Sequence, residues 1–128
     1  MRLLLDTHIL LWALGQPKRL PAAALPLLED PANDVLFSAA SIWEIAIKSQ
    51  IGRADFAASA ERIAHAASES GFVELPIRAE HCARTATLPF HHRDPFDRLL
   101  IAQAQAEPAR LLTVDAQLAP YSELVTLL

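Results

Sequence analysis

The chain has 128 residues, 52% of them apolar and 20% charged, and its formal net charge is −4. This length suits one compact domain of the commonest size, here expected to span residues 1–128, and the composition excludes intrinsic disorder and low-complexity proteins. The excess of acidic residues on its own argues against an ordinary nucleic-acid-binding protein, because such proteins have a positively charged binding surface.

The hydrophobic pattern predicts strands that alternate with helices along the chain. In chain order, we expect a strand over residues 2–6, helices over 9–14 and 21–29, a strand over 35–37, helices over 39–50 and 56–70, a strand over 72–75, helices over 78–88 and 95–106, and strands over 111–114 and 124–128. Thr7, Ser38 and Asp94 are the expected N-caps of the helices that follow them. This order is typical of an α/β sandwich with a small, mostly parallel sheet flanked by helices.

Two acids come directly after predicted strands. Asp6 ends the first apolar run, and Asp115 follows the strand over 111–114. Each carboxylate suits the cap of a following helix, which is the simpler interpretation of its position. In parallel sheets, however, ligands bind outside the carboxyl ends of the strands. The position of Asp6 and Asp115 therefore leaves open whether they cap helices or form a binding site.

Glu44 lies in a helix that is apolar on nearly every side, a pattern that predicts burial from several directions. Lys48 follows one turn later, so the alternative is a surface Glu–Lys pair, which contributes only about 0.2–0.5 kcal/mol. Yet Ala40, Ile47 and Ile51 share the face of Glu44 and Lys48. Because burial of an unpaired carboxylate is costly, this position favours a functional role for Glu44.

The segment 94–97 (DPFD) predicts a helix start. Asp94 suits the N-cap, Pro95 the first helical position, and Asp97 the acidic position of a capping box. Asp97 nevertheless shares its helix face with core residues such as Leu100. We therefore expect Asp97 to point along the sheet edge, whereas Asp94 need only cap the helix.

Several other side chains are assigned simpler roles. Trp12, Trp43 and Cys82 are expected in the core. His91 and His92 are adjacent in a predicted loop, so they point apart and do not predict a zinc site. The single cysteine excludes an internal disulfide and predicts a reducing compartment. No stretch approaches the roughly 20 apolar residues that a transmembrane helix needs, so we expect a soluble, cytoplasmic protein without a membrane partner.

Four blocks of sequence follow one another in a known order. They are LLLDTHILLW at 3–12, FSAASIWEIAIK at 37–48, HRDPFDRLLIA at 92–102 and LTVD at 112–115. Together they resemble the PIN-domain family, and specifically the VapC-type toxins of bacterial toxin–antitoxin pairs, over essentially the whole chain. Leu118 is a departure, since the family pattern has an aromatic residue after the last acid.

The resemblance implies a three-layer PIN-like fold and an endoribonuclease that cleaves RNA phosphodiester bonds with Mg²⁺ or Mn²⁺. Its acids correspond to Asp6, Glu44, Asp97 and Asp115, with Asp94 at the edge of the site. It also implies a homodimer that a small VapB-like antitoxin neutralises. If the four acids cluster around cations, the rest of the chain has 11 acidic and 11 basic residues, so the net charge no longer argues against an RNA substrate.

Hard divalent cations suit this reaction because they prefer carboxylate oxygens and stabilise an anionic phosphate. Mg²⁺ takes only about one or two carboxylates directly, so Asp6 and Asp97 are the expected direct ligands. Glu44 and Asp115 would hold coordinated waters or a second ion. The expected supporting residues are Thr7 and Thr113, which would orient the carboxylates, and Arg93, Arg98 and His92, which would contact the RNA backbone.

Two other functions remain open. A Mg²⁺-dependent phosphatase that forms an aspartyl-phosphate would suit Asp6, but such an enzyme needs a second Asp two positions later, where His8 stands. A non-catalytic RNA- or protein-binding module of the same fold would keep the acids as helix caps, but no cap explains Glu44. The helices over 21–29 and 56–70 are candidate surfaces for a partner or a dimer.

Overall fold

The computed structural model describes residues 1–53, 56 and 58–128. Within these residues, a five-stranded parallel sheet has the order β3-β2-β1-β4-β5. The strands are β1 (Arg2–Leu5), β2 (Asp34–Ser38), β3 (Val73–Leu75), β4 (Arg110–Thr113) and β5 (Val125–Leu127). Each lies within one residue of its predicted bounds, and the predicted α/β sandwich is confirmed.

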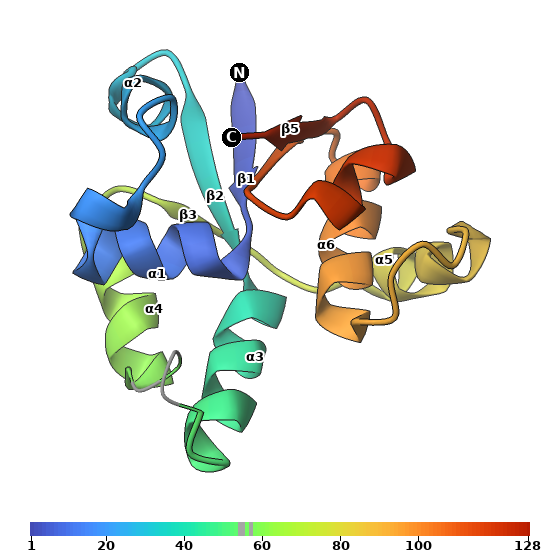
Figure 1. Cartoon of the computed structure of the whole chain (residues 1–128), viewed down its shortest axis with the longest axis horizontal. Helices are drawn as coiled ribbons and strands as arrows, with labels where there is room; N and C mark the ends of the chain where they lie inside the picture. The colour runs from blue at the N-terminus through green and yellow to red at the C-terminus, as the bar shows by residue number, and fades with distance from the viewer. Residues whose placement is uncertain (54–55, 57) are drawn as a thin grey trace.

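Helices cover both faces of this sheet, as Figure 1 shows. They are α1 (Thr7–Gly15), α2 (Ala24–Glu29), α3 (Ala39–Gln50), α4 (Ala60–Glu69), α5 (Ala79–Arg84) and α6 (Pro95–Ala106), with short 3₁₀ helices at Pro17–Arg19, Thr85–Thr87 and Ala116–Tyr121. In the view of Figure 1, α1 and α4 lie on one side of the strands, and α5 and α6 lie on the other. The helix α3 begins directly after β2 and contacts α1, α4 and α6.

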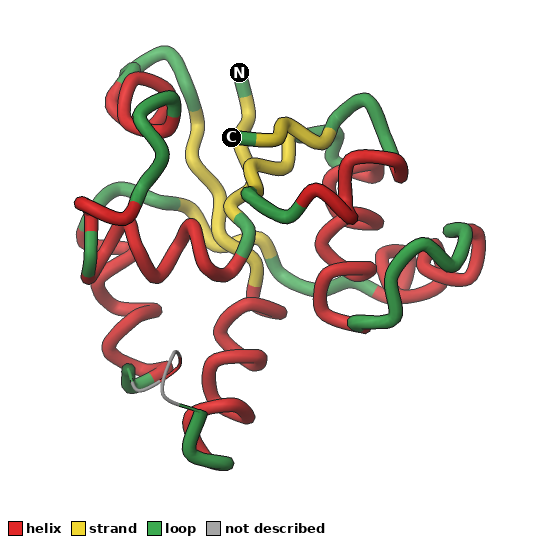
Figure 2. The backbone as a smooth tube through the Cα atoms, viewed as in Figure 1, coloured by secondary structure: helices red, strands yellow, loops and turns green. Residues whose placement is uncertain are grey.

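Two hydrophobic cores lie on opposite faces of the sheet, because successive side chains of a strand alternate in direction. Leu3 and Leu5 of β1 pack with α1, α3 and α4, whereas Leu4 packs with α6. Figure 2 shows the strands passing between the two groups of helices. Burial on both faces explains why β1 and β4 are continuous apolar runs in the sequence.

The starts of α2 and α4 differ from their predicted positions, each for a local reason. The α2 helix begins at Ala24 and not at residue 21. An earlier start would place Pro26 beyond the first turn, where its missing N–H would break a helical hydrogen bond. The α4 helix begins after Ser59, whose hydroxyl accepts from the N–H of Arg62 at 3.4 Å. The predicted start at Phe56 therefore fails, and residue 57 of that predicted helix lies outside the described residues.

The predicted helix over 78–88 is interrupted. The α5 helix ends at Arg84 and continues as the 3₁₀ helix Thr85–Thr87. The hydroxyls of Thr85 and Thr87 donate to the carbonyls of Cys82 and Arg84 at 2.6 and 2.8 Å. Threonine side chains that bond to nearby carbonyls in this way compete with regular α-helical bonding.

The strand order places a topological switch point between β1 and β4. The chain moves from β1 outward to β2 and β3, and then returns to the other side of β1 to form β4 and β5. Since all strands are parallel, their carboxyl ends meet at one edge of the sheet. Ligands of such sheets bind at the carboxyl edge where the connections diverge. No helix in the described part of the chain is long and apolar enough to cross a membrane.

Candidate active site

Asp6 lies at the switch point, directly after β1, and is 6% exposed. The Thr113 hydroxyl, at the end of β4, donates to Asp6 Oδ2 at 2.5 Å, and the N–H of His8 donates to Oδ1 at 3.3 Å. Asp6 is therefore the N-cap of α1, and the prediction that Thr7 takes this position is wrong. One carboxylate thus caps a helix and also points toward the other acids, so the two interpretations of Asp6 do not exclude each other.

Glu44 is held inside the site by two partners and is 3% exposed. The Thr7 hydroxyl donates to Glu44 Oε1 at 2.7 Å, and Lys48 Nζ donates to Oε2 at 2.5 Å. The Thr7 hydroxyl also lies 2.9 Å from that of Ser41. The Glu–Lys pair of the alternative interpretation exists, but it is largely buried and not on the open surface. These partners offset the cost of burying the carboxylate.

Asp94 and Asp97 come from the start of α6, as predicted. Asp94 is the N-cap, and its Oδ1 accepts from the N–H groups of Phe96 and Asp97 at 2.9 and 3.4 Å. Asp94 Oδ2 lies 3.9 Å from Lys48 Nζ, so Lys48 stands between α3 and α6. Asp97 is mostly buried and is close enough to Asp6, Glu44 and Asp94 to be repelled by them.

Asp115 lies at the rim of the site, with a side chain that is 38% exposed. Its Oδ1 accepts from the N–H of Gln117 at 2.9 Å and caps the 3₁₀ helix after β4. Its own N–H donates to the Thr113 hydroxyl at 3.0 Å, and the same hydroxyl donates to Asp6. Thr113 therefore links the two acids that follow β1 and β4.

His92 joins these acids, which the sequence analysis did not predict. Its Nε2 lies 2.8 Å from Asp97 Oδ2 and 3.7 Å from Asp115 Oδ2. The ring of His91 instead packs against the ring of Tyr121 at 5.0 Å. Adjacent histidines do point apart, as expected, but one of the two points into the site. Sequence position alone does not indicate this placement, because the loop is held by the Tyr121 hydroxyl, which accepts the His92 N–H from 29 residues away.

Burial and mutual repulsion shift the pKa values of two acids. Burial raises the pKa of Asp6 above its ordinary value, against the hydrogen bond from Thr113. Burial and the neighbouring carboxylates of Asp6, Asp94 and Glu44 raise the pKa of Asp97 to about 7, against the hydrogen bond from His92. Carboxylates that crowd one another in this way fit a divalent cation, because a hard cation prefers oxygen ligands and removes the repulsion.

Comparison with known proteins identifies the family of this fold. The family model described as PIN domain matches residues 3–124. The chain belongs to the PIN-domain family. No curated protein matches the sequence. A solved structure similar to this PIN domain is that of VapBC2 from Rickettsia felis bound to a DNA fragment from their promoter, with a TM-score of 0.67 and 16% identity over 99% of this chain and 97% of that one. At this identity the similarity establishes the fold alone.

Arg98 of the PIN domain does not have the exposure expected of an RNA-binding residue, since it is 8% exposed. Its guanidinium donates to the carbonyls of Thr85, Leu88 and Pro89 at 2.9, 3.2 and 2.9 Å and to the Tyr121 hydroxyl at 3.2 Å. Arg98 therefore ties the segment before α6 to that helix, which is a structural role. Arg93 is exposed, in the same loop as His92, and its RNA contact stays a prediction.

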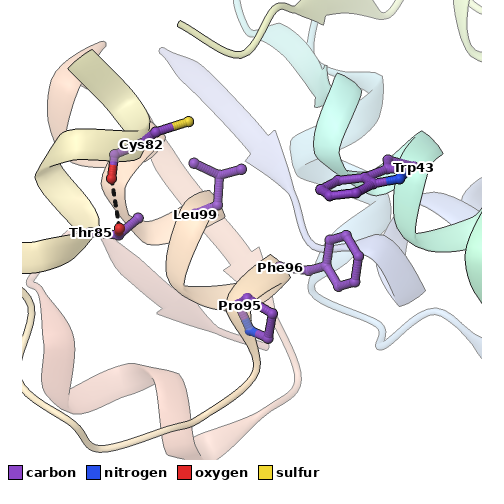
Figure 3. Close-up of a pocket in the computed structure, with 6 residues that line it drawn as sticks. All are labelled: Trp43, Cys82, Thr85, Pro95, Phe96 and Leu99. Atoms are coloured by element: carbon purple, nitrogen blue, oxygen red, sulfur yellow. Dashed lines mark hydrogen bonds between the residues drawn. The ribbon is translucent and has the colours of Figure 1, made fainter. Parts of the chain in front are cut away.

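An apolar pocket lies beside the acids, and Figure 3 shows its lining of Trp43, Cys82, Thr85, Pro95, Phe96 and Leu99. The rings of Trp43 and Phe96 meet edge to face at 5.2 Å. Trp43 is 58% exposed and Cys82 is exposed, so the prediction that they lie in the core of this PIN domain is wrong. Part of α3 extends beyond the ends of the strands (Figure 1), which leaves the Trp43 side chain exposed. Trp12 is partly buried and packs against the core.

Proposed function

We propose that this PIN domain is a Mg²⁺- or Mn²⁺-dependent endoribonuclease and the toxin of a VapC-type toxin–antitoxin pair. The observation that supports the proposal is the group of crowded carboxylates at the carboxyl edge, in which Asp97 has a pKa of about 7. Helix capping alone requires no such crowding. Asp6 caps α1 and Asp94 caps α6, whereas Glu44 and Asp97 cap nothing.

The acids divide the work according to whether a positively charged side chain already neutralises them. The partners of Asp6 are neutral donors, whereas Glu44 pairs with the Lys48 ammonium. Asp6 and Asp97 would hold the cation directly, because each carboxylate faces the other acids. Both oxygens of Glu44 already accept hydrogen bonds from Thr7 and Lys48, so Glu44 would act through its charge and through coordinated water. The half-exposed Asp115 would do the same at the rim. When bound, the cation supplies activation of a water for attack on phosphorus and neutralisation of phosphate charge.

The hydroxyl-bearing residues keep these carboxylates in fixed orientations. Thr113 fixes Asp6 Oδ2 and also accepts the N–H of Asp115, so it sets two acids from one position. Thr7 does the same for Glu44 from the first turn of α1. Residues that orient ligands in this way affect metal affinity about as strongly as many ligands do, roughly 10–100-fold. Arg93, exposed in the loop before α6, would contact the phosphate backbone of the RNA.

The proposed partners follow from the toxin assignment. We infer that a small VapB-like antitoxin neutralises the protein, and the similarity of its fold to a chain of the VapBC2 complex supports this. We also propose a homodimer, which light scattering of the purified protein tests directly. RNA cleavage requires no membrane, and the cytoplasm is the compartment where the substrate is available.

Cleavage of RNA by the purified protein tests the proposal. The protein should cut RNA in the presence of Mg²⁺ or Mn²⁺ and stop when the chelator EDTA is added. Asp6→Asn should abolish cleavage, with a thermal midpoint unchanged or raised, because the buried charge is removed. Asp34→Asn is the matched control, since Asp34 is an exposed acid at the opposite end of β2 and should leave cleavage intact.

Other outcomes separate the alternatives. If Asp6→Asn unfolds the protein, the carboxylate is structural. If calorimetry shows no binding of divalent cations, a non-catalytic binding module is the better interpretation. A covalent phosphoryl-enzyme on Asp6 would instead indicate the phosphatase.

A further inference from the structure

The Nε2 atom of His92 lies where a ligand atom of a bound metal ion would lie. It stands between the Asp97 carboxylate of α6 and the Asp115 carboxylate that follows β4, at 2.8 and 3.7 Å. His92, Asp94 and Asp97 offer ligand atoms that all lie within 4.8 Å of one another. The acids of the site are therefore joined by an imidazole nitrogen, a donor of different chemistry.

These separations match those of ligands around one ion. Ligand atoms about 2.1 Å from a cation lie about 3 Å apart when they are neighbours at a right angle, and about 4.2 Å apart when opposite. The 2.8 Å between His92 and Asp97 corresponds to the first arrangement. A cation between them would replace the present hydrogen bond without requiring the two side chains to separate.

The backbone of the loop aims His92 at the acids. The His92 N–H donates to the Tyr121 hydroxyl at 2.7 Å, and that hydroxyl lies 3.3 Å from the His92 carbonyl oxygen. Arg98, itself buried, donates to the same hydroxyl at 3.2 Å. His91 packs on the Tyr121 ring instead. Tyr121 contacts the backbone N–H and carbonyl of His92, so replacement of the His92 side chain leaves the loop anchored.

We propose that His92 is a ligand of the cation through Nε2, so that the site combines one imidazole nitrogen with carboxylate oxygens. The inference rests on the proposed function, since it adds a ligand to the same site. Mg²⁺ takes oxygen ligands, whereas Mn²⁺, as a first-row transition-metal ion, binds carboxylate oxygens and also accepts an imidazole nitrogen. The nitrogen ligand therefore makes the site bind Mn²⁺ more tightly than Mg²⁺.

Pulsed electron paramagnetic resonance of the protein loaded with Mn²⁺ alone tests the ligand. The wild-type spectrum should show coupling to a nitrogen nucleus, and isotope labelling of histidine should change that coupling. His92→Ala should remove it. His91→Ala and His65→Ala are matched controls and should keep it, because the His91 ring packs on Tyr121 and the exposed His65 ring lies on α4 beside Glu69.

Titration calorimetry gives a second measurement on the same variants. His92→Ala should weaken Mn²⁺ binding about tenfold. Mg²⁺ binding should weaken much less, so the preference for Mn²⁺ should shrink. A thermal midpoint of His92→Ala equal to that of the wild type would establish that the variant is folded.

The outcomes distinguish this inference from the proposed function. If the wild-type protein cleaves RNA with Mn²⁺ but shows no histidine nitrogen coupling, His92 is not a ligand and the nuclease stands. If the coupling persists in His92→Ala, or disappears equally in His91→Ala, the assignment to His92 is overturned. If Mn²⁺ does not bind the wild-type protein at all, both proposals fail.

Discussion

The fold opposes the ionisation of Asp97, whose pKa is raised from 3.8 to about 7 by burial and by its carboxylate neighbours. A folded-state pKa above the unfolded value means that the folded protein binds the proton more tightly. The contribution to stability is therefore complete below about pH 4 and is lost as the pH rises through about 7. Without metal, we therefore expect the thermal midpoint to fall as the pH rises from about 4 to above 7.

Asp97→Asn should remove that dependence, because the amide stays neutral. At pH 7 and without metal, the variant should be more stable than wild type by on the order of 4 kcal/mol, and the gain should vanish near pH 4. Thermal unfolding across this pH range, followed by circular dichroism, measures the difference. Asp34→Asn should follow the wild-type profile. Parallel profiles for Asp97→Asn and wild type would show that Asp97 is not the titrating group.

Lys48 gives a second prediction at this scale, because its ammonium contacts Glu44 and lies near Asp94. Lys48→Met removes a positive charge from the edge of the site, so Mn²⁺ should bind about three- to tenfold more tightly. RNA cleavage should nevertheless fall, since Glu44 Oε2 loses the partner that fixes it. Lys18→Met, at an exposed position, is the control. A variant that loses metal binding and cleavage together would indicate a merely structural Lys48.

The sequence indicates which acids lie at this edge of the sheet, but it does not indicate the direction of the His92 ring. Asp6 and Asp115 were indicated by strand ends, and Glu44 by its position on an apolar helix face. These are local signals, readable within one element. His92 contacts Asp97 only because Tyr121, which is 29 residues away, accepts its N–H. No local pattern contains that long-range contact.

At the scale of whole elements, the strands and two of the three helix caps named from the sequence were predicted correctly, because their causes are local. An apolar run of four or five residues can be buried only between two layers, and Ser38 and Asp94 cap their helices as their residue types favour. The exposed Trp43 shows the limit of this reasoning. Apolar residues around α3 predicted burial on every side, yet part of α3 extends beyond the ends of the strands (Figure 1) and leaves the Trp43 side chain exposed.

The 3₁₀ helix Ala116–Tyr121 connects two parts of the site, and this leads to a prediction. Tyr121→Phe removes the hydroxyl that accepts from the His92 N–H and from Arg98. A buried guanidinium then loses one acceptor, so stability should fall by about 1–3 kcal/mol. Mn²⁺ affinity should fall severalfold, because the loop that carries His92 loses its anchor.

Thermal unfolding and calorimetry measure both effects of Tyr121→Phe. Arg93→Lys is a suitable comparison, since Arg93 lies in the same loop and is exposed, and the substitution keeps its charge. It should leave Mn²⁺ affinity unchanged. Equal losses in the two variants would mean that the loop tolerates no change, and that the Tyr121 hydroxyl has no special part in placing His92.

At the scale of the whole molecule, the strand order explains why distant residues converge. Because β1 lies between β2 and β4, the acids that follow β1 and β4 meet at the switch point, and α3 and α6 add their acids from either side. If the proposed cation binds where the acids concentrate, it supplies positive charge there, and a protein with net charge −4 can then bind a polyanion. The sheet is stable enough to hold this group of charges because both of its faces are buried.

Metal binding should therefore stabilise the entire fold, and the effect should depend on pH. A ligand that binds only the folded state stabilises it by about 2.7 kcal/mol at 100 times its dissociation constant. Saturating Mn²⁺ should raise the thermal midpoint by several degrees at pH 7.5. The gain should be much smaller at pH 5, because protonated Asp97 cannot act as a ligand while its pKa is about 7. Asp6→Asn should abolish the gain at both pH values, and an equal gain in that variant would place Mn²⁺ elsewhere on the protein.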